Sequence, residues 1–111
     1  MIAKYVHRDE IIDYTPTADV AAGDIVVIGD IVGIAKLDIK AGVLGALALT
    51  GVYDIVKAAG TGTAVTRGAK VYWNATTKVA TADSSSGVNL YLGKAFAAAA
   101  DADTVVRVRL N

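Results

Sequence analysis

Short alternating runs of apolar residues, interrupted by glycine, constrain this chain more than any other feature of its sequence. Residues 105–110 place three apolar side chains on one face and Arg107 and Arg109 on the other, which is the period-two pattern of a half-buried strand. Other short β-branched or alternating runs occupy residues 25–28, 31–35, 45–51, 69–73 and 78–81. Turn residues such as Gly29-Asp30 separate them, and the pattern predicts an all-β protein.

The turn signals recur at short intervals, as they do in β-sandwiches and β-barrels. A chain of 111 residues is long enough for one ordinary domain. We therefore expect a small single-domain β-sandwich or β-barrel of short antiparallel strands over residues 17–111. The aperiodic residues 1–16 are expected to form an N-terminal arm, and the alanine-rich run 95–100 favours at most about two turns of helix.

Two parts of the sequence resemble each other weakly. Residues 20–26 are similar to residues 65–71. Each segment is followed by a run with a central glycine, around Gly33 and Gly93, and then by an alternating run. Two similar three-strand units would bury a shared core. The alternative is that any glycine-punctuated β protein resembles itself, and both interpretations stay open at this stage.

Charge and composition exclude several classes of partner. Eleven basic and eleven acidic residues cancel, and no basic stripe is visible in the sequence beyond Arg107 and Arg109, so we expect no nucleic-acid partner. The apolar runs are far shorter than the ~20 residues that cross a bilayer, so no membrane partner is expected. The N-terminus is charged early and lacks the apolar core of a secretory signal, which predicts synthesis in the cytoplasm.

The chain offers little chemistry for catalysis or cofactor binding. His7 is the only histidine and there is no cysteine, so a catalytic triad or zinc site is not expected. Between Gly87 and Gly93 lie five residues, and Ala95 follows Lys94, whereas a phosphate loop needs four residues and then Ser or Thr. We predict a non-enzymatic protein with no cofactor and no metal, in which aromatic residues such as Trp73 anchor the core.

The N-terminal segment holds the best candidates for exposed contacts, because it mixes tyrosine, isoleucine and charge without periodicity. The predicted contact residues, toward a partner protein or a second subunit, are Tyr5, His7, Arg8, Tyr14 and Pro16.

Several features follow one another in an order that characterises a known family. They are Asp13-Tyr14-Thr15-Pro16, Ala22 to Val27, Gly29 to Ala35, Gly51 to Ile55, Gly68 to Asn74, Leu92 to Ala95 and Val105 to Leu110. In this order the chain resembles the DUF2190 family of tailed-phage capsid cement, or decoration, proteins. The resemblance implies a β domain that binds the outer surface of the major capsid protein lattice as a homotrimer and stabilises the head. It also implies a location on the outer capsid surface of the virion and synthesis in the cytoplasm of a host bacterium.

Members of this family have also been labelled RecA/RadA-like recombinases, a label that the incomplete phosphate loop does not support. The alternative function is a phage DNA-recombination accessory or nucleic-acid-binding β module. That function would need a basic groove with stacking aromatic residues, and zero net charge argues against it. A small hydrolase is disfavoured by the lone histidine. A head-fibre base is a further alternative, and its function is close to that of a cement protein.

Overall fold

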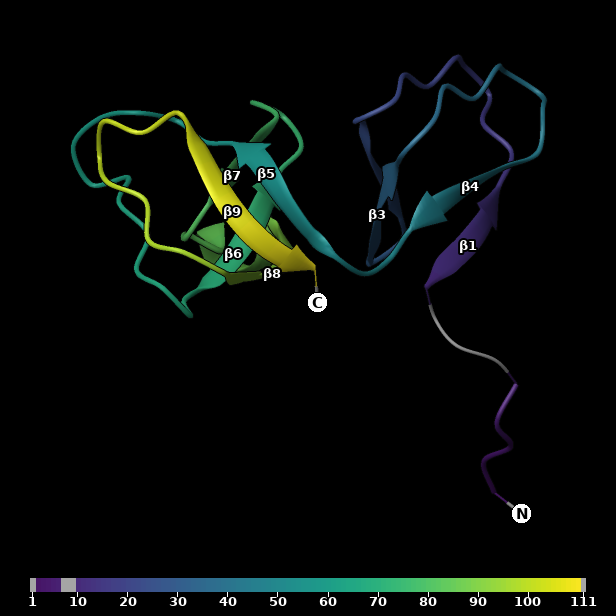
Figure 1. Ribbon diagram of the computed structural model, residues 1–111, viewed down its shortest axis with the longest axis horizontal. Coiled ribbons are helices and arrows are strands. Elements are labelled where there is room, and N and C mark those ends of the chain that lie inside the picture. The colour runs from purple at the N-terminus through teal and green to yellow at the C-terminus, as the bar shows by residue number, and fades with distance from the viewer. Residues whose placement is uncertain (1, 7–9, 111) are drawn as a thin grey trace. The chain divides into compact units, whose positions relative to one another are not determined.

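A computed structural model describes residues 2–6 and 10–110 of the chain (Figure 1). Within these residues the chain forms two antiparallel sheets and one short 3-10 helix, η1, at Ser85–Gly87. The predicted all-β class is confirmed. The chain divides into two compact units, Met1–Val26 with Gly33–Thr50 and Val27–Val32 with Gly51–Asn111. In the described part of the chain no helix is long and apolar enough to span a membrane.

The first sheet has the strand order β1-β4-β3-β2. Its strands are β1 Ile11–Tyr14, β2 Ile25–Ile28, β3 Ile31–Ala35 and β4 Gly45–Ala48. Leu47 on β4 lies opposite both Ile12 and Ala35 and is fully buried. Gly33 allows this close packing, because a Cβ atom there would lie 2.8 Å from the Cβ atom of Leu47.

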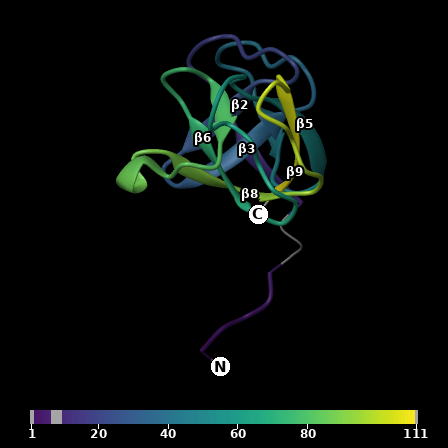
Figure 2. The same cartoon turned by 90° about the vertical axis from the view of Figure 1, so that its left-hand side faces the viewer.

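The second sheet has the order β5-β9-β8-β6-β7, and its first four strands are labelled in Figure 2. Its strands are β5 Val52–Val56, β6 Lys70–Asn74, β7 Val79–Thr81, β8 Leu90–Ala95 and β9 Val105–Leu110. Buried and exposed residues alternate along β9 as predicted, and Trp73 lies in the core as predicted. An isolated parallel bridge between Lys57 and Ala80 connects the β5 side of the sheet to β7 at the other edge.

The internal similarity is confirmed by the pairing pattern of the two sheets. Strands β1, β2, β3 and β4 correspond to β5, β6, β8 and β9, because in each sheet the first strand pairs with the last and the last with the third. Ala35 lies opposite Leu47 as Ala95 lies opposite Val108. The second sheet differs by an insertion that contains β7 and η1.

The predicted repeat of three strands is wrong in one respect, because each repeat has a further strand at its start. These strands, β1 and β5, share one identical residue in register, Asp13 and Asp54. Their position is fixed by pairing with a strand more than 30 residues away along the chain. Local sequence similarity could not reveal such a pairing.

Candidate interaction surface

The predicted contact residues have different environments. Residues 2–6 have no regular secondary structure, and the Tyr5 side chain is 80% exposed. Tyr14 lies on β1 opposite Gly45 and is partly buried. Pro16 is buried, and its carbonyl accepts a hydrogen bond of 2.8 Å from the Gly42 amide. His7 and Arg8 lie outside the described residues, so Tyr5 is the described candidate with the most accessible side chain.

A row of three cationic side chains crosses the exposed face of the second sheet. Lys70 on β6 lies opposite Lys94 on β8, and Lys94 lies opposite Arg109 on β9. Directly opposite residues of antiparallel strands project from the same face, with Cβ atoms about 5 Å apart. All three side chains are exposed. None of them has an ion pair or side-chain hydrogen bond to another residue in the described part of the chain. We call these three residues the basic row.

The charge of the neighbouring arginine on β9 is compensated by an aspartate. Arg107 lies opposite Asp54 on β5, and its Nε donates to Oδ1 at 2.8 Å while Nη2 donates to Oδ2 at 3.2 Å. The hydrogen bond from Arg107 lowers the pKa of Asp54, desolvation opposes the shift, and the Arg107 charge adds to the lowering. Arg109 instead lies opposite Val52, which leaves its charge without a partner on the facing strand.

An aromatic pair lies on the same strands as the basic row. Tyr72 follows Lys70 by two residues on β6 and lies opposite Tyr91 on β8. The two rings meet edge to face, with centroids 6.0 Å apart and planes at 70°. Because side chains two apart on a strand share a face, Tyr72 projects from the face that carries Lys70.

Sequence reasoning missed the basic row, since no basic stripe was visible along the chain. Its three residues are contributed by three strands, and only the strand register brings them together. Like charges directly opposite each other destabilise a sheet, so local rules of strand pairing give no signal for this arrangement. The outward positions of Arg107 and Arg109 were the one visible trace.

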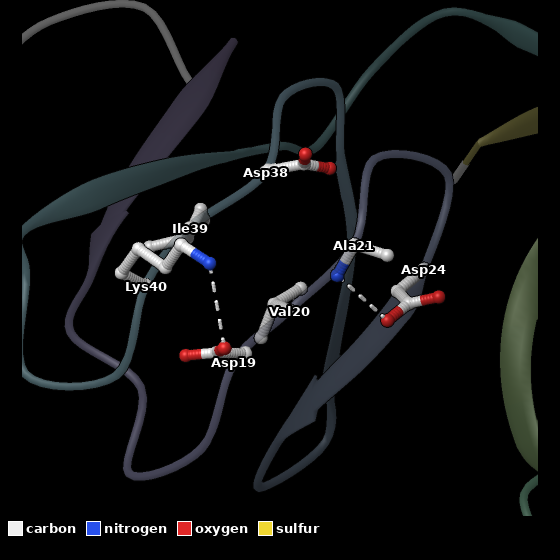
Figure 3. A pocket seen from close by; sticks show the side chains of 7 residues that line it. All are labelled: Asp19, Val20, Ala21, Asp24, Asp38, Ile39 and Lys40. Carbon is white, nitrogen blue, oxygen red and sulfur yellow. Dashed lines mark hydrogen bonds and ion pairs between the residues drawn. The ribbon is translucent and has the colours of Figure 1, made fainter.

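An acidic cavity lies in the first unit (Figure 3). It has a volume of about 260 Å³, and its charged lining residues are Asp19, Asp24, Asp38 and Lys40. Lys40 Nζ lies 3.6 Å from Asp19 Oδ2, so the cavity carries three carboxylates and one ammonium group. We call this cavity, with its four charged residues, the acidic cavity.

Backbone amides fix the three carboxylates of the acidic cavity. Asp19 Oδ1 accepts from the Ala41 amide at 2.9 Å, and Asp38 Oδ1 accepts from the Ala22 amide at 2.8 Å. Asp24 Oδ2 accepts from the Ala21 amide at 3.0 Å. The backbone bonds leave the second oxygen of each carboxylate unused, and that of Asp19 already faces Lys40. Asp24 and Asp38 are therefore held in place and still able to accept a cation.

The two units carry opposite formal charges. The segments that make up the first unit contain four Lys and Arg and six Asp and Glu, a formal charge of −2. Those of the second contain seven Lys and Arg and five Asp and Glu, a formal charge of +2. The neutrality of the whole chain therefore conceals a charge difference between its units.

Other polar features of the fold are explained by its structure. Lys57 is buried, and its Nζ donates to the carbonyls of Ala58 and Asp103 and to the Thr63 hydroxyl at 2.9–3.1 Å. All three ammonium protons are therefore used within the second unit. Among the described residues, no group of three or more His, Asp or Glu side chains is arranged to hold a metal ion.

The comparison with known families gives one match over nearly the whole chain. A family model described as phage cement protein matches residues 6–110. The predicted resemblance to DUF2190 is confirmed, because the two are the same family. No curated protein and no solved structure is significantly similar to the chain.

Proposed function

Since the chain belongs to the phage cement protein family, a structural and non-enzymatic family of the virion capsid, we propose that it binds the outer surface of the major capsid protein lattice. The bound protein stabilises the head against heat and internal pressure. The family match over residues 6–110 is the observation that carries this proposal.

We further propose that the protein acts as a homotrimer and that its N-terminal arm contributes to docking. The exposed side chains of Ile2, Tyr5 and Val6 support a docking role for the segment before β1. Because Pro16 is buried, we assign it to anchoring the end of the arm and not to contact with a partner. Weak contacts repeated over three linked subunits would gain strength through effective concentration.

The test measures the thermal stability of expanded capsids that lack decoration, with and without the purified protein. The wild-type protein should raise the temperature at which these capsids release their DNA or lose their shape. A variant that lacks residues 2–6 keeps all nine described strands and should bind capsids less tightly. Unchanged capsid stability with saturating wild-type protein would contradict the proposed function. Unchanged binding by the truncated variant would contradict the role of the arm alone.

A nucleic-acid-binding module is the second candidate, and the basic row beside the Tyr72–Tyr91 pair favours it. Single-stranded nucleic acids bind to positive grooves with aromatic platforms. However, three cations on a neutral chain make few phosphate contacts. The cement function is therefore preferred, and a DNA mobility-shift assay at low salt separates the two.

A further inference from the structure

We propose that the basic row of one copy docks against the acidic cavity of a second copy. The inference builds on the proposed homo-oligomer and names the surfaces that would join its subunits. It is motivated by two oppositely charged surfaces, each formed within one unit, on a chain whose net charge is zero.

The basic row is a poor arrangement for an isolated molecule. Lys94 lies between Lys70 and Arg109, opposite one cation on each side, and such like-charge pairs are unfavourable within a sheet. Two residues earlier on β9, the charge of Arg107 is compensated by an ion pair with Asp54 on the facing strand. An anionic partner placed over Lys94 would relieve the repulsion on both of its neighbours.

The acidic cavity supplies anions that are already fixed in position. Asp19, Asp24 and Asp38 are each held by a backbone amide. Less conformational entropy is therefore lost when a cation binds to them than for free surface carboxylates. Lys40 pairs with Asp19, which leaves Asp24 and Asp38 without an ion pair among the described residues.

Contacts between two different surfaces are heterologous. Each copy can therefore contribute its basic row to one neighbour and its acidic cavity to another. Such contacts form closed rings when the rotation between neighbours closes, and open chains when it does not. The equal and opposite charges of the two units would favour this head-to-tail arrangement over one that pairs identical surfaces. Pairing identical charged surfaces would place like charges together.

Sedimentation velocity of the full chain at about 20 mM and about 500 mM salt tests the proposal. The wild type should associate at low salt and dissociate at high salt. Lys94→Glu should weaken the association constant about tenfold. The matched control Lys78→Glu makes the same charge change in the β6–β7 turn, away from the row, and should leave association unchanged.

A double-mutant cycle tests whether the two surfaces touch each other. Asp38→Asn keeps an Oδ1 acceptor for the Ala22 amide but removes the charge, and Lys94→Gln removes the facing charge. Each should weaken association roughly three- to fivefold. Together they should weaken it by less than the product of the two effects, because they remove the same interaction.

Several results would overturn the inference. They are a monomeric wild type at low salt, equal effects of Lys94→Glu and Lys78→Glu, or multiplicative effects in the cycle. If the wild type shifted DNA in a low-salt mobility-shift assay and Lys94→Glu abolished that shift, the basic row would be reassigned to nucleic-acid binding. Because capsid binding is measured separately, a protein that binds capsids but stays monomeric would overturn this inference and leave the proposed function intact.

Discussion

Lys57 illustrates, at the scale of a single residue, how a charged side chain can belong to a core. It is 3% exposed, and three oxygen atoms surround its ammonium group. These acceptors come from three different positions: Ala58, Thr63 and Asp103. Lys57 therefore ties the segment after β5 to the loop that precedes β9.

Replacement of Lys57 by methionine should destabilise the protein by about 1–3 kcal/mol. Methionine fills much of the same volume, but the acceptors around it lose their donor. Urea denaturation should show a lower midpoint with an unchanged slope. Arg67→Met, at an exposed loop position, is the control and should change stability by no more than about 0.5 kcal/mol. An equally small change for Lys57→Met would refute the structural role of this lysine.

The ion pair between Asp54 and Arg107 predicts a pH-dependent contribution to stability. Its hydrogen bond lowers the pKa of Asp54 below the ordinary value of 3.8. The contribution is therefore present above about pH 3.8 and is lost as the pH falls through the lower pKa of the folded state. It should be small, because both side chains are about half exposed.

Thermal denaturation of the wild type and Asp54→Asn at several pH values measures this contribution. The wild type should be the more stable protein at pH 7, and the difference should shrink below pH 4. A difference that stays constant down to pH 2 would show that the charge of Asp54 is not its source.

At the scale of elements, each unit has a hydrogen bond between an aspartate of one loop and a backbone amide of another. The aspartate lies in the earlier loop in the first unit and in the later loop in the second unit. In the first unit Asp19 accepts from the Ala41 amide. In the second, Asp101 accepts from the Ala64 amide at 2.8 Å. Val20 bridges Ile39 in one unit as Val65 bridges Ala99 in the other, so the two connections occupy corresponding places.

Asp101→Ala should therefore loosen the connection between its two loops and destabilise the protein by about 0.5–2 kcal/mol, as loss of a side-chain cap does. Asp101→Asn keeps the acceptor and should cost less. Hydrogen exchange of the Ala64 amide should accelerate in Asp101→Ala. In contrast, Asp30→Ala, in the exposed β2–β3 turn, should leave it unchanged. Unchanged exchange in Asp101→Ala would exclude this connection as a source of local stability.

Strands with strong local patterns could be predicted from the sequence. Residues 25–28, 31–35 and 105–110 form strands with the predicted bounds, because β-branched residues and alternation are local signals. Residues 95–100 favoured helix but continue from β8 into a loop, where Ala99 pairs with Val65. This tertiary pairing outweighs the helix propensity of alanine.

The candidate surfaces could be predicted less well than the fold. The exposure of Tyr5 follows from its place in an aperiodic segment. The burial of Pro16 depends on β1 pairing with a distant strand. The basic row depends on the register of three strands, and a single sequence does not determine register when the strands are far apart along the chain.

At the scale of the whole molecule, a family match and a set of exposed surfaces converge on a structural role in the virion. The exposed side chains of Ile2, Tyr5 and Val6 and the opposite formal charges of the two units suit a protein that assembles on a repetitive surface. In a lattice, each weak contact is multiplied by the number of neighbours.

The central claim is capsid binding, and cosedimentation with expanded, undecorated capsids of the cognate phage tests it most directly. The purified protein should pellet with the capsids, saturate at about one copy per capsid subunit if each copy occupies one equivalent site of the lattice, and show no binding to DNA at the same ionic strength. Absence of capsid binding, together with salt-sensitive binding to DNA, would contradict the account and favour the nucleic-acid module instead.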